Sequence, residues 1–297
     1  MASIDMPAAE VEITIDQVEA LLADQYPELA RAHVTDLAHG WDNILFLIDR
    51  TWSARFPRRQ MSVGLIGNER RWLPRLAPLL PLPIPAPIFV GEPGHGYPWP
   101  WLITRWIPGE SAATAPVVDR EECARQLGGF LFALHRPAPA EAPRNPFRGI
   151  PLHERDTATR QRISRLGDSV DPVLLGARWA AALSAARFDS DPVWLHGDLH
   201  PNNLICEGGR LAGVIDFGDI TSGDPATDLA VAWMMFPLEL HSVFRNAYGD
   251  VDWDTWERAR GWALSLGLAY LANSADNPIM RRLGERTIGA VLADHPS

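Results

Sequence analysis

The sequence lacks lysine: all 27 of its basic residues are arginine, in a chain of 297 residues. Any permanently cationic side chain that binds an anion here must therefore be a guanidinium, which makes two-pronged hydrogen bonds where an ammonium acts as a point charge. Cysteine is also scarce. The two cysteines, Cys123 and Cys206, cannot form a disulfide framework, and we expect neither to be functional.

Long apolar runs are absent as well. No stretch of 18 or more apolar residues occurs, which excludes a transmembrane helix. Residues 1–22 are acidic where a secretory signal would be basic, so we expect a cytoplasmic protein with no membrane partner. The formal net charge is −10, and the acidic excess is larger in the C-terminal half. This argues against a nucleic-acid partner, which requires a basic face, and favours a cleft that attracts cations.

Residues 193–219, VWLHGDLHPNNLICEGGRLAGVIDFGD, contain the strongest pattern in the chain. Two apolar runs, at 193–195 and 211–215, are each closed by Gly or Asp, and they predict buried strands. We expect these strands to pair as a hairpin that turns at Gly208 and Gly209. The pairing would bring together the polar residues at the strand ends: His196, Asp198, His200, Asn202, Asn203, Asp216 and Asp219.

The spacing in this stretch matches the kinase signature H-R-D-L-x-x-x-N at residues 196–203, except that Gly197 replaces the arginine, and residues 216–218 read D-F-G. Phosphoryl transfer needs such a set, because one carboxylate must accept a hydroxyl proton while other oxygen ligands hold Mg²⁺ on the phosphates. Either triplet alone is common in loops. Both together, in this order and flanked by strands, are specific.

This segment resembles the aminoglycoside phosphotransferase family, a branch of the protein-kinase-like fold that phosphorylates hydroxyl groups of small molecules. Residues 223–230, GDPATDLA, are similar to the next segment of that family. The resemblance implies that Asp198 is the catalytic base and that Asn203 and Asp216 are Mg²⁺ ligands. It also implies that ATP or GTP is the phosphate donor and that His196 braces the loop.

The N-terminal part of the chain predicts a nucleotide site. Strand-like runs at 34–37 and 44–48 flank a turn at 38–43 that contains one glycine, so the pattern alone predicts only a hairpin turn. The resembled family has a similar G-x-D-N turn ahead of its other motifs. The resemblance therefore implies a phosphate contact by Gly40 and Asn43.

Arg55 is the predicted substitute for a phosphate-binding lysine. It lies in a strand expected at 52–57, where the resembled family carries Lys or Arg facing the α- and β-phosphates. Glu69, at the start of a helix expected over 67–76, would orient it. The alternative is that Arg55 belongs with Arg58 and Arg59 to a solvated basic patch, which is the more common location of arginine.

The smaller lobe should end in a strand at 99–107. The hinge near 104–106 would then place backbone groups of Thr104 and Trp106 against the nucleotide base. We therefore divide the chain into an N-terminal nucleotide-binding lobe, 1–106, and a C-terminal catalytic and acceptor-binding lobe, 107–297.

The remaining patterns complete a two-lobed, protein-kinase-like fold of the α+β class, with an antiparallel sheet in the small lobe and a larger, mainly helical lobe. Residues 76–91 are rich in proline and are expected to be extended. Asp228 lies near a helix N-terminus and is expected to fasten the catalytic loop. Apolar periodicity predicts helices at 14–25, 119–135, 157–166, 172–186, 225–236, 253–272 and 278–292.

These features predict a small-molecule O-phosphotransferase that moves the γ-phosphate of ATP or GTP to a hydroxyl of a small cationic acceptor, an aminoglycoside-like or related antibiotic. Macrolides, and metabolites such as choline or homoserine, remain open as acceptors, and segments 136–190 and 233–292 should contain the residues that choose among them. A nucleotide-binding pseudokinase that serves as an interaction module is an alternative of another class. The presence of Asp198, Asn203 and Asp216 argues against it, because a protein that only binds nucleotide needs no base.

Overall fold

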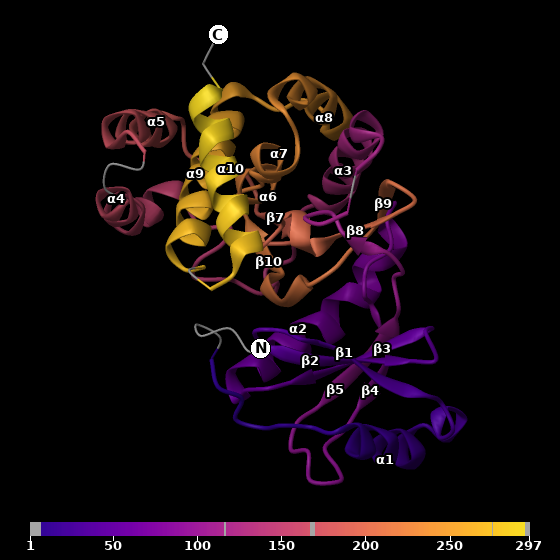
Figure 1. Ribbon diagram of the computed structural model, residues 1–297. Helices are drawn as coiled ribbons and strands as arrows, with labels where there is room; N and C mark the ends of the chain where they lie inside the picture. The colour runs from indigo at the N-terminus through magenta and orange to yellow at the C-terminus, as the bar shows by residue number, and fades with distance from the viewer. Residues whose placement is uncertain (1–6, 116, 167–169, 275, 295–297) are drawn as a thin grey trace.

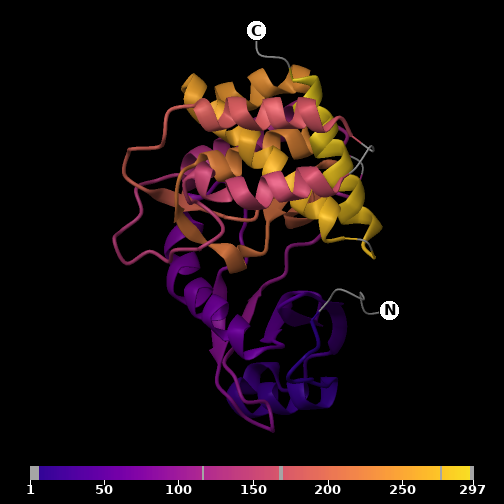
Figure 2. The same ribbon diagram turned by 90° about the vertical axis from the view of Figure 1, so that its left-hand side faces the viewer.

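The computed structural model describes residues 7–115, 117–166, 170–274 and 276–294. The chain forms two lobes (Figure 1): a smaller one around a five-stranded sheet, drawn in indigo and purple, and a larger, mainly helical one that ends in orange and yellow. The view turned by 90° shows the same division (Figure 2). The predicted two-lobed α+β fold is confirmed.

The smaller lobe is an antiparallel sheet in the order β1-β2-β3-β5-β4. Helix α1 (Ile15–Gln25) packs on this sheet and begins at Thr14, whose side chain accepts a hydrogen bond from the Gln17 N–H. A 3₁₀ turn, η1 (Pro27–Leu29), follows the helix. The strands are β1 (Val34–His39), β2 (Asn43–Ile48), β3 (Trp52–Pro57), β4 (Pro87–Gly91) and β5 (Trp101–Arg105).

Helix α2 (Gln60–Leu76) begins well before residue 67, so the predicted start was wrong. Gly64 and Gly67 lower the helix propensity of its first half, and the apolar face becomes clear only afterwards. In the folded chain Ile66, Glu69 and Leu73 are buried on that face. A 3₁₀ turn, η2 (Ala77–Leu79), follows, and the proline-rich segment then runs without a helix to β4.

The larger lobe surrounds α9, which is buried along most of its length. The predicted helix at 225–236 is in fact two short helices, α6 and α7. The elements are β6 (Glu110–Ser111), α3 (Arg120–Leu134), η3 (Leu152–Arg155), α4 (Asp156–Arg165), α5 (Pro172–Ser184), β7 (Val193–Leu195), η5 (Pro201–Asn203), β8 (Leu204–Glu207), β9 (Arg210–Val214), η6 (Phe217–Asp219), β10 (Thr221–Gly223), α6 (Ala226–Leu229), α7 (Val231–Met235), η7 (Leu238–Leu240), α8 (His241–Tyr248), α9 (Trp253–Ala272) and α10 (Pro278–Ala293).

The strands of the motif pair differently from the prediction. β7 pairs with β10, while β9 pairs with β8 across the turn at Gly208 and Gly209. The predicted hairpin was wrong because the four residues of β8 are themselves a strand, too short to be recognised by periodicity. The two motif loops still meet, since the Ile215 N–H donates to the Asn203 carbonyl at 2.9 Å.

Helices α4 and α5 pack against α9. Both views place α4 below α5, on the side nearer the smaller lobe (Figures 1 and 2). Cys123 and Cys206 are buried and are not joined by a disulfide. Among the residues that the structure describes, no helix combines the length and the apolar character needed to cross a membrane.

Candidate active site

Asp228, in α6, fastens the loop that follows β7. Its carboxylate accepts hydrogen bonds from the backbone N–H groups of His196 at 2.7 Å and Gly197 at 2.9 Å. The His196 ring donates from Nε2 to the Ile215 carbonyl at 2.9 Å, so its Nδ1 is the acceptor for the Asp198 N–H at 3.3 Å. His196 therefore braces the Asp198 loop against the chain that leaves β9, and both residues have structural roles.

Gly197, which replaces the arginine of the kinase signature, is required by the backbone. Its φ angle is 87°, a left-handed conformation that glycine adopts without steric cost. A Cβ atom at this position would lie 2.3 Å from the carbonyl oxygen of Asp219. The Asp198 loop and the D-F-G turn are therefore in direct backbone contact, and no side chain can separate them.

Asp198 is ionised and lies among basic groups. Its Oδ1 is 3.1 Å from Nη2 of Arg148, and its Oδ2 is 3.4 Å from Nε2 of His200. Burial alone would raise the pKa of the Asp198 carboxyl, but His200 and then Arg148 outweigh burial and hold the pKa below its usual range. The side chain therefore stands as a carboxylate that can accept a proton.

Asn203 and Asp216 lie on adjacent segments, joined by the backbone hydrogen bond between Asn203 and Ile215. Asn203 donates from Nδ2 to the Asp198 carbonyl at 2.8 Å, which leaves its amide oxygen as a ligand. Asp216 has a left-handed backbone (φ 63°) and a side chain that is 56% exposed. Such oxygen ligands suit Mg²⁺, which usually takes one or two carboxylates together with substrate phosphates and water.

The two residues would not form a metal site alone. Within the described part of the chain, no group of three or more His, Cys, Asp or Glu side chains is arranged to hold a metal ion. The pair fits a Mg²⁺ ion whose remaining ligands come from a nucleotide. The donor set of one carboxylate and one amide oxygen is consistent with such shared coordination.

Arg55 connects the two lobes. Its Nη1 is 2.9 Å from the Glu69 carboxylate on α2, and its Nη2 is 3.1 Å from Oδ1 of Asp216. With its amide oxygen facing the guanidinium, Asn43 also accepts from Nε and Nη2 at 2.9 Å. Burial raises the pKa of the Glu69 carboxyl to about 7, against the opposing effect of Arg55. The Arg55 side chain is 12% exposed and is paired with acidic residues. It therefore does not belong to a solvated basic patch.

The turn after β1 is held by two side chains from the segment between β3 and α2. Arg58 donates from Nη1 to the Gly40 carbonyl at 2.8 Å, and Arg59 donates from Nη2 to Oδ1 of Asp42 at 2.6 Å. The Gly40 N–H donates to the Asn43 carbonyl at 2.8 Å. Arg58 and Arg59 therefore shape the turn, and its phosphate contact remains a prediction.

The predicted hinge groups are already hydrogen-bonded in part. The Thr104 side chain is buried, with its hydroxyl 2.9 Å from that of Ser53, and the Trp106 N–H donates to the Thr51 carbonyl at 2.9 Å. A nucleotide base would have to use other backbone groups of residues 104–106. That contact also remains a prediction.

The sequence model of the phosphotransferase enzyme family matches residues 33–262, which is more than half of the chain. The chain belongs to this family. Among the curated relatives of this phosphotransferase-family protein, an aminoglycoside 3′-phosphotransferase from Streptomyces fradiae is 30% identical over 184 residues, covering 56% of this chain and 64% of the relative. The chain matches less than two thirds of the length of each curated relative found.

Solved structures of phosphotransferases share the fold. The GDP complex of wild-type aminoglycoside 2′-phosphotransferase-IIIa superposes with a TM-score of 0.68 at 20% identity, covering 95% of this chain and 99% of the other. A macrolide 2′-phosphotransferase from Brachybacterium faecium gives 0.62 at 22% identity, covering 95% and 98%. At these identities the likeness establishes the architecture and nothing about the acceptor.

Two residues of this phosphotransferase-family site were not predicted. Arg148 belongs to no recognisable motif, and the sequence gives no signal for it. Tyr270 was assigned to an apolar helix face, but burial and the charge of Asp198 raise the pKa of its hydroxyl, and its ring lies 5.6 Å from that of His200. A buried tyrosine needs a partner for its hydroxyl, and that is the one signal that could have drawn attention to it.

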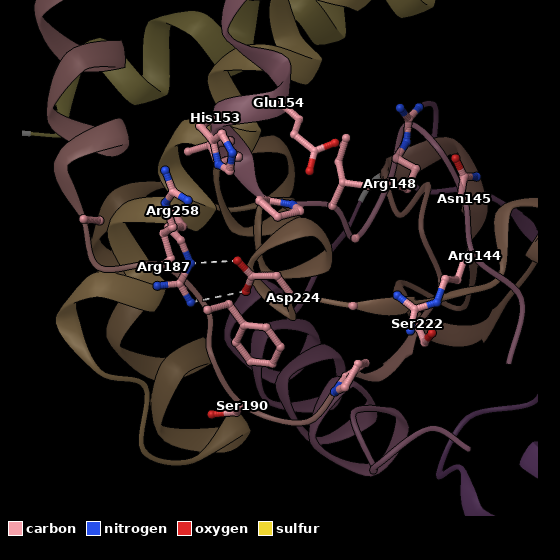
Figure 3. A pocket seen from close by; sticks show the side chains of 18 of the residues that line it. Arg144, Asn145, Arg148, His153, Glu154, Arg187, Ser190, Ser222, Asp224 and Arg258 are labelled. Atoms are coloured by element: carbon pink, nitrogen blue, oxygen red, sulfur yellow. Dashed lines mark hydrogen bonds and ion pairs between the residues drawn. The ribbon is translucent and has the colours of Figure 1, made fainter. Parts of the chain in front are cut away.

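A cavity of about 420 Å³ is lined in part by Arg148 (Figure 3). The ion pair between Asp224 and Arg258, 2.7 Å long, forms one wall, and the dashed lines in Figure 3 mark it. Arg144 and Asn145 lie at the opposite side of the view, and Asn145 donates from Nδ2 to the Asp219 carboxylate. Arg148 therefore lines this cavity and also contacts Asp198.

Proposed function

We propose that the protein transfers the γ-phosphate of ATP or GTP to a hydroxyl group of a small molecule, with an aminoglycoside-like or related antibiotic as the first acceptor class to test. The observation that carries this proposal is the convergence of ionised Asp198, Asn203 and Asp216 with buried Arg55 from the other lobe. Family membership supports the reaction class, and the GDP complex of a structural neighbour supports a nucleotide donor.

Asp198 would act as the base. The acceptor hydroxyl would donate a hydrogen bond to the Asp198 carboxylate and attack the γ-phosphorus. As the new O–P bond forms, the hydroxyl proton passes to Asp198 and the nucleoside diphosphate leaves with the electrons of the broken P–O bond. The loop needs no rearrangement to present this carboxylate, because Asp228 and His196 already fix it.

Asn203 and Asp216 would hold Mg²⁺, which supplies charge neutralisation on the β- and γ-phosphate oxygens when it is bound. Arg55 would donate to the α- and β-phosphates and Glu69 would keep it oriented. Gly40 and Asn43 would approach the phosphates from the turn after β1. In this proposal the nucleotide lies between a lobe of residues 1–106 and a lobe of residues 107–297.

A nucleotide-consumption screen tests the proposal. ATP and GTP are offered separately with aminoglycosides, macrolides, choline and homoserine, and each rate is compared with hydrolysis in the absence of an acceptor. We expect one acceptor group to raise consumption well above that control, with a phosphorylated product found by mass spectrometry. Nucleotide binding without acceptor-dependent consumption for any compound would instead favour the pseudokinase alternative.

A further inference from the structure

Three arginines of the larger lobe, Arg148, Arg155 and Arg162, lie near enough for the charge of Arg148 to act on the other two. Arg148 contacts the Asp198 carboxylate at 3.1 Å. Arg155 ends η3 and Arg162 lies two helical turns further along, so both project from the same face of the η3–α4 segment. Helix α4 lies on the side of the larger lobe that is nearer the smaller lobe (Figures 1 and 2).

Helix α4 is anchored to the helix that borders the base. Thr159 of α4 and Ser265 of α9 are both buried, and their hydroxyl oxygens are 2.9 Å apart. Five residues further along α9, Tyr270 interacts with Asp198. Between α4 and the C-terminal end of α9, Arg162 and Asn273 line a cavity of about 790 Å³. Arg162 is therefore held at a fixed position beside an open volume, which Arg165 and the ion pair of Arg281 with Glu285 also line.

Arg155 and Arg162 lack the acidic partner that Arg148 has in Asp198. In the described ranges Arg155 and Arg162 form no ion pair, whereas Arg160 of the same helix pairs with Asp156 at 2.7 Å. The buried atoms Nε of Arg148, Nε of Arg155 and Nη1 of Arg162 have no hydrogen-bond acceptor. A buried donor without an acceptor is unfavourable. Arg155 and Arg162 are only half-buried, so an anion would bind through the exposed part of each guanidinium group.

The electrostatics agree with the geometry. Burial lowers the pKa of Arg155 and of Arg162, and the nearby charge of Arg148 lowers both further. No acidic side chain offsets these effects for either residue. The set is therefore a cluster of like charges, and a polycationic acceptor would add to the repulsion.

We infer that Arg155 and Arg162 bind an anionic group, a carboxylate or a phosphate, of the acceptor whose hydroxyl Asp198 deprotonates. The inference rests on the proposed phosphotransferase function, and it replaces the cationic antibiotic with a hydroxylated acid as the acceptor class to test first. Guanidinium groups suit both anions because they donate two parallel hydrogen bonds. Arg148 pairs with Asp198, and its charge acts on both Arg155 and Arg162.

Binding of a small anion tests the site without turnover. Malonate, and separately inorganic phosphate, is titrated calorimetrically into the full chain with saturating ADP or GDP, so that Arg55 is already occupied. We expect wild type and Arg160→Gln to bind malonate with equal Kd and the double variant Arg155→Gln/Arg162→Gln to bind it at least about tenfold more weakly, as for loss of a charge-assisted pair. Arg160 is the matched control because it lies on the same helix and already has a partner.

A charge-conserving variant excludes a folding defect as the cause. Arg162→Lys keeps the charge, so it should retain more of the malonate affinity than Arg162→Gln, while both show the same thermal unfolding. Binding of phosphate but not malonate would identify the anion as a phosphate. Absence of binding by either anion in wild type, or equal binding in the double variant, would overturn the site.

Turnover with matched sugars assigns the anion to the acceptor. Glucuronate, glucose and glucosamine share a ring and differ in carrying an acid, no charge or an amine. We expect nucleotide consumption to be fastest with glucuronate and its advantage to vanish in Arg155→Gln/Arg162→Gln. Transfer that is fastest to glucosamine, and unchanged in the double variant, would refute the inference while supporting the proposed function. Malonate binding with no transfer to any acceptor would refute the proposed function and leave the anion site.

Discussion

The proposed nucleotide side and the proposed acceptor side of Asp198 differ in how many acidic partners their arginines have. On the nucleotide side, buried Arg55 has two acidic partners, Glu69 and Asp216. On the acceptor side, Arg148 pairs with Asp198 and is also near the charge of Asp219, while Arg155 and Arg162 form no ion pair among the described residues. A cation held by acids keeps its geometry before a ligand arrives. Cations without acidic partners are neutralised only when an anionic ligand binds. The difference therefore favours an anionic acceptor beside Arg155 and Arg162.

The largest expected effect comes from the base between the two sides. Asp198→Asn keeps the size of the side chain but removes the proton acceptor, so kcat should fall by roughly 10² to 10⁴. Nucleotide affinity should change little, because Arg55 and its partners are untouched. Steady-state kinetics with calorimetric nucleotide binding checks both quantities. An unaltered kcat would rule Asp198 out as the base.

The next effect concerns Asp216, the acidic residue that faces both Arg55 and the predicted Mg²⁺. Asp216→Asn should weaken Mg-nucleotide binding and nearly abolish turnover, because charge on the β- and γ-oxygens would no longer be neutralised. Nucleotide titrations with and without Mg²⁺ measure this. If wild type and variant bind nucleotide equally, with no dependence on Mg²⁺, the metal assignment is wrong.

Because Glu69 is expected to act only by orienting Arg55, the effects of substituting these two residues should not add. Arg55→Ala and Glu69→Ala should each raise the nucleotide KM or lower kcat, by about tenfold for a lost charge-assisted hydrogen bond. The double variant should cost clearly less than the sum of the two. Arg55→Lys should fall between wild type and Arg55→Ala, because lysine keeps the charge but loses the two-pronged donor.

Arg59 supplies the contrast for that cycle, because it bonds to Asp42 and not to the Arg55 cluster. Arg59→Ala should change the nucleotide KM less than Arg55→Ala. If Arg55→Ala left the nucleotide KM unchanged while Arg59→Ala raised it strongly, the phosphate contact would have to be assigned to the turn after β1 and not to Arg55.

The smallest effect is a change in pH dependence on the acceptor side. His200 and Arg148 hold the pKa of Asp198 below its usual range, so the base stays charged as pH falls. Removing the cation in Arg148→Ala raises that pKa, and activity should then be lost at a higher pH than in wild type. The acid limb of kcat/KM against pH measures the shift. An unmoved acid limb would show that Arg148 does not act on the base.

The sequence predicted the parts of the site that depend on short-range pattern. Asp198, Asn203 and Asp216 follow in a fixed spacing, and Glu69 falls on the buried face of α2, where it meets Arg55. Their placement near one another follows from the fold. Their catalytic, metal and nucleotide roles remain proposals.

The rest could not be predicted, because it depends on long-range packing. β7 pairs with β10 and not with β9, and no local pattern distinguishes these partners. Arg148 reaches Asp198 from a loop fifty residues earlier in the chain. Whether Arg155 and Arg162 have ion-pair partners depends on which segments pack around α4. A local pattern of arginine and polar residues predicts only a solvated helix face.

Measuring both ligand affinities in both sets of variants tests most directly whether Arg55 and the pair Arg155 and Arg162 belong to two separate sites. The Kd of nucleotide and the Kd of malonate are measured in wild type, Arg55→Ala and Arg155→Gln/Arg162→Gln. Each change should weaken its own ligand by about tenfold or more and leave the other within about twofold, as for sites without shared partners. If Arg155→Gln/Arg162→Gln weakens nucleotide as much as Arg55→Ala does, while malonate binding is unaffected, the two sides are one site and the account is contradicted.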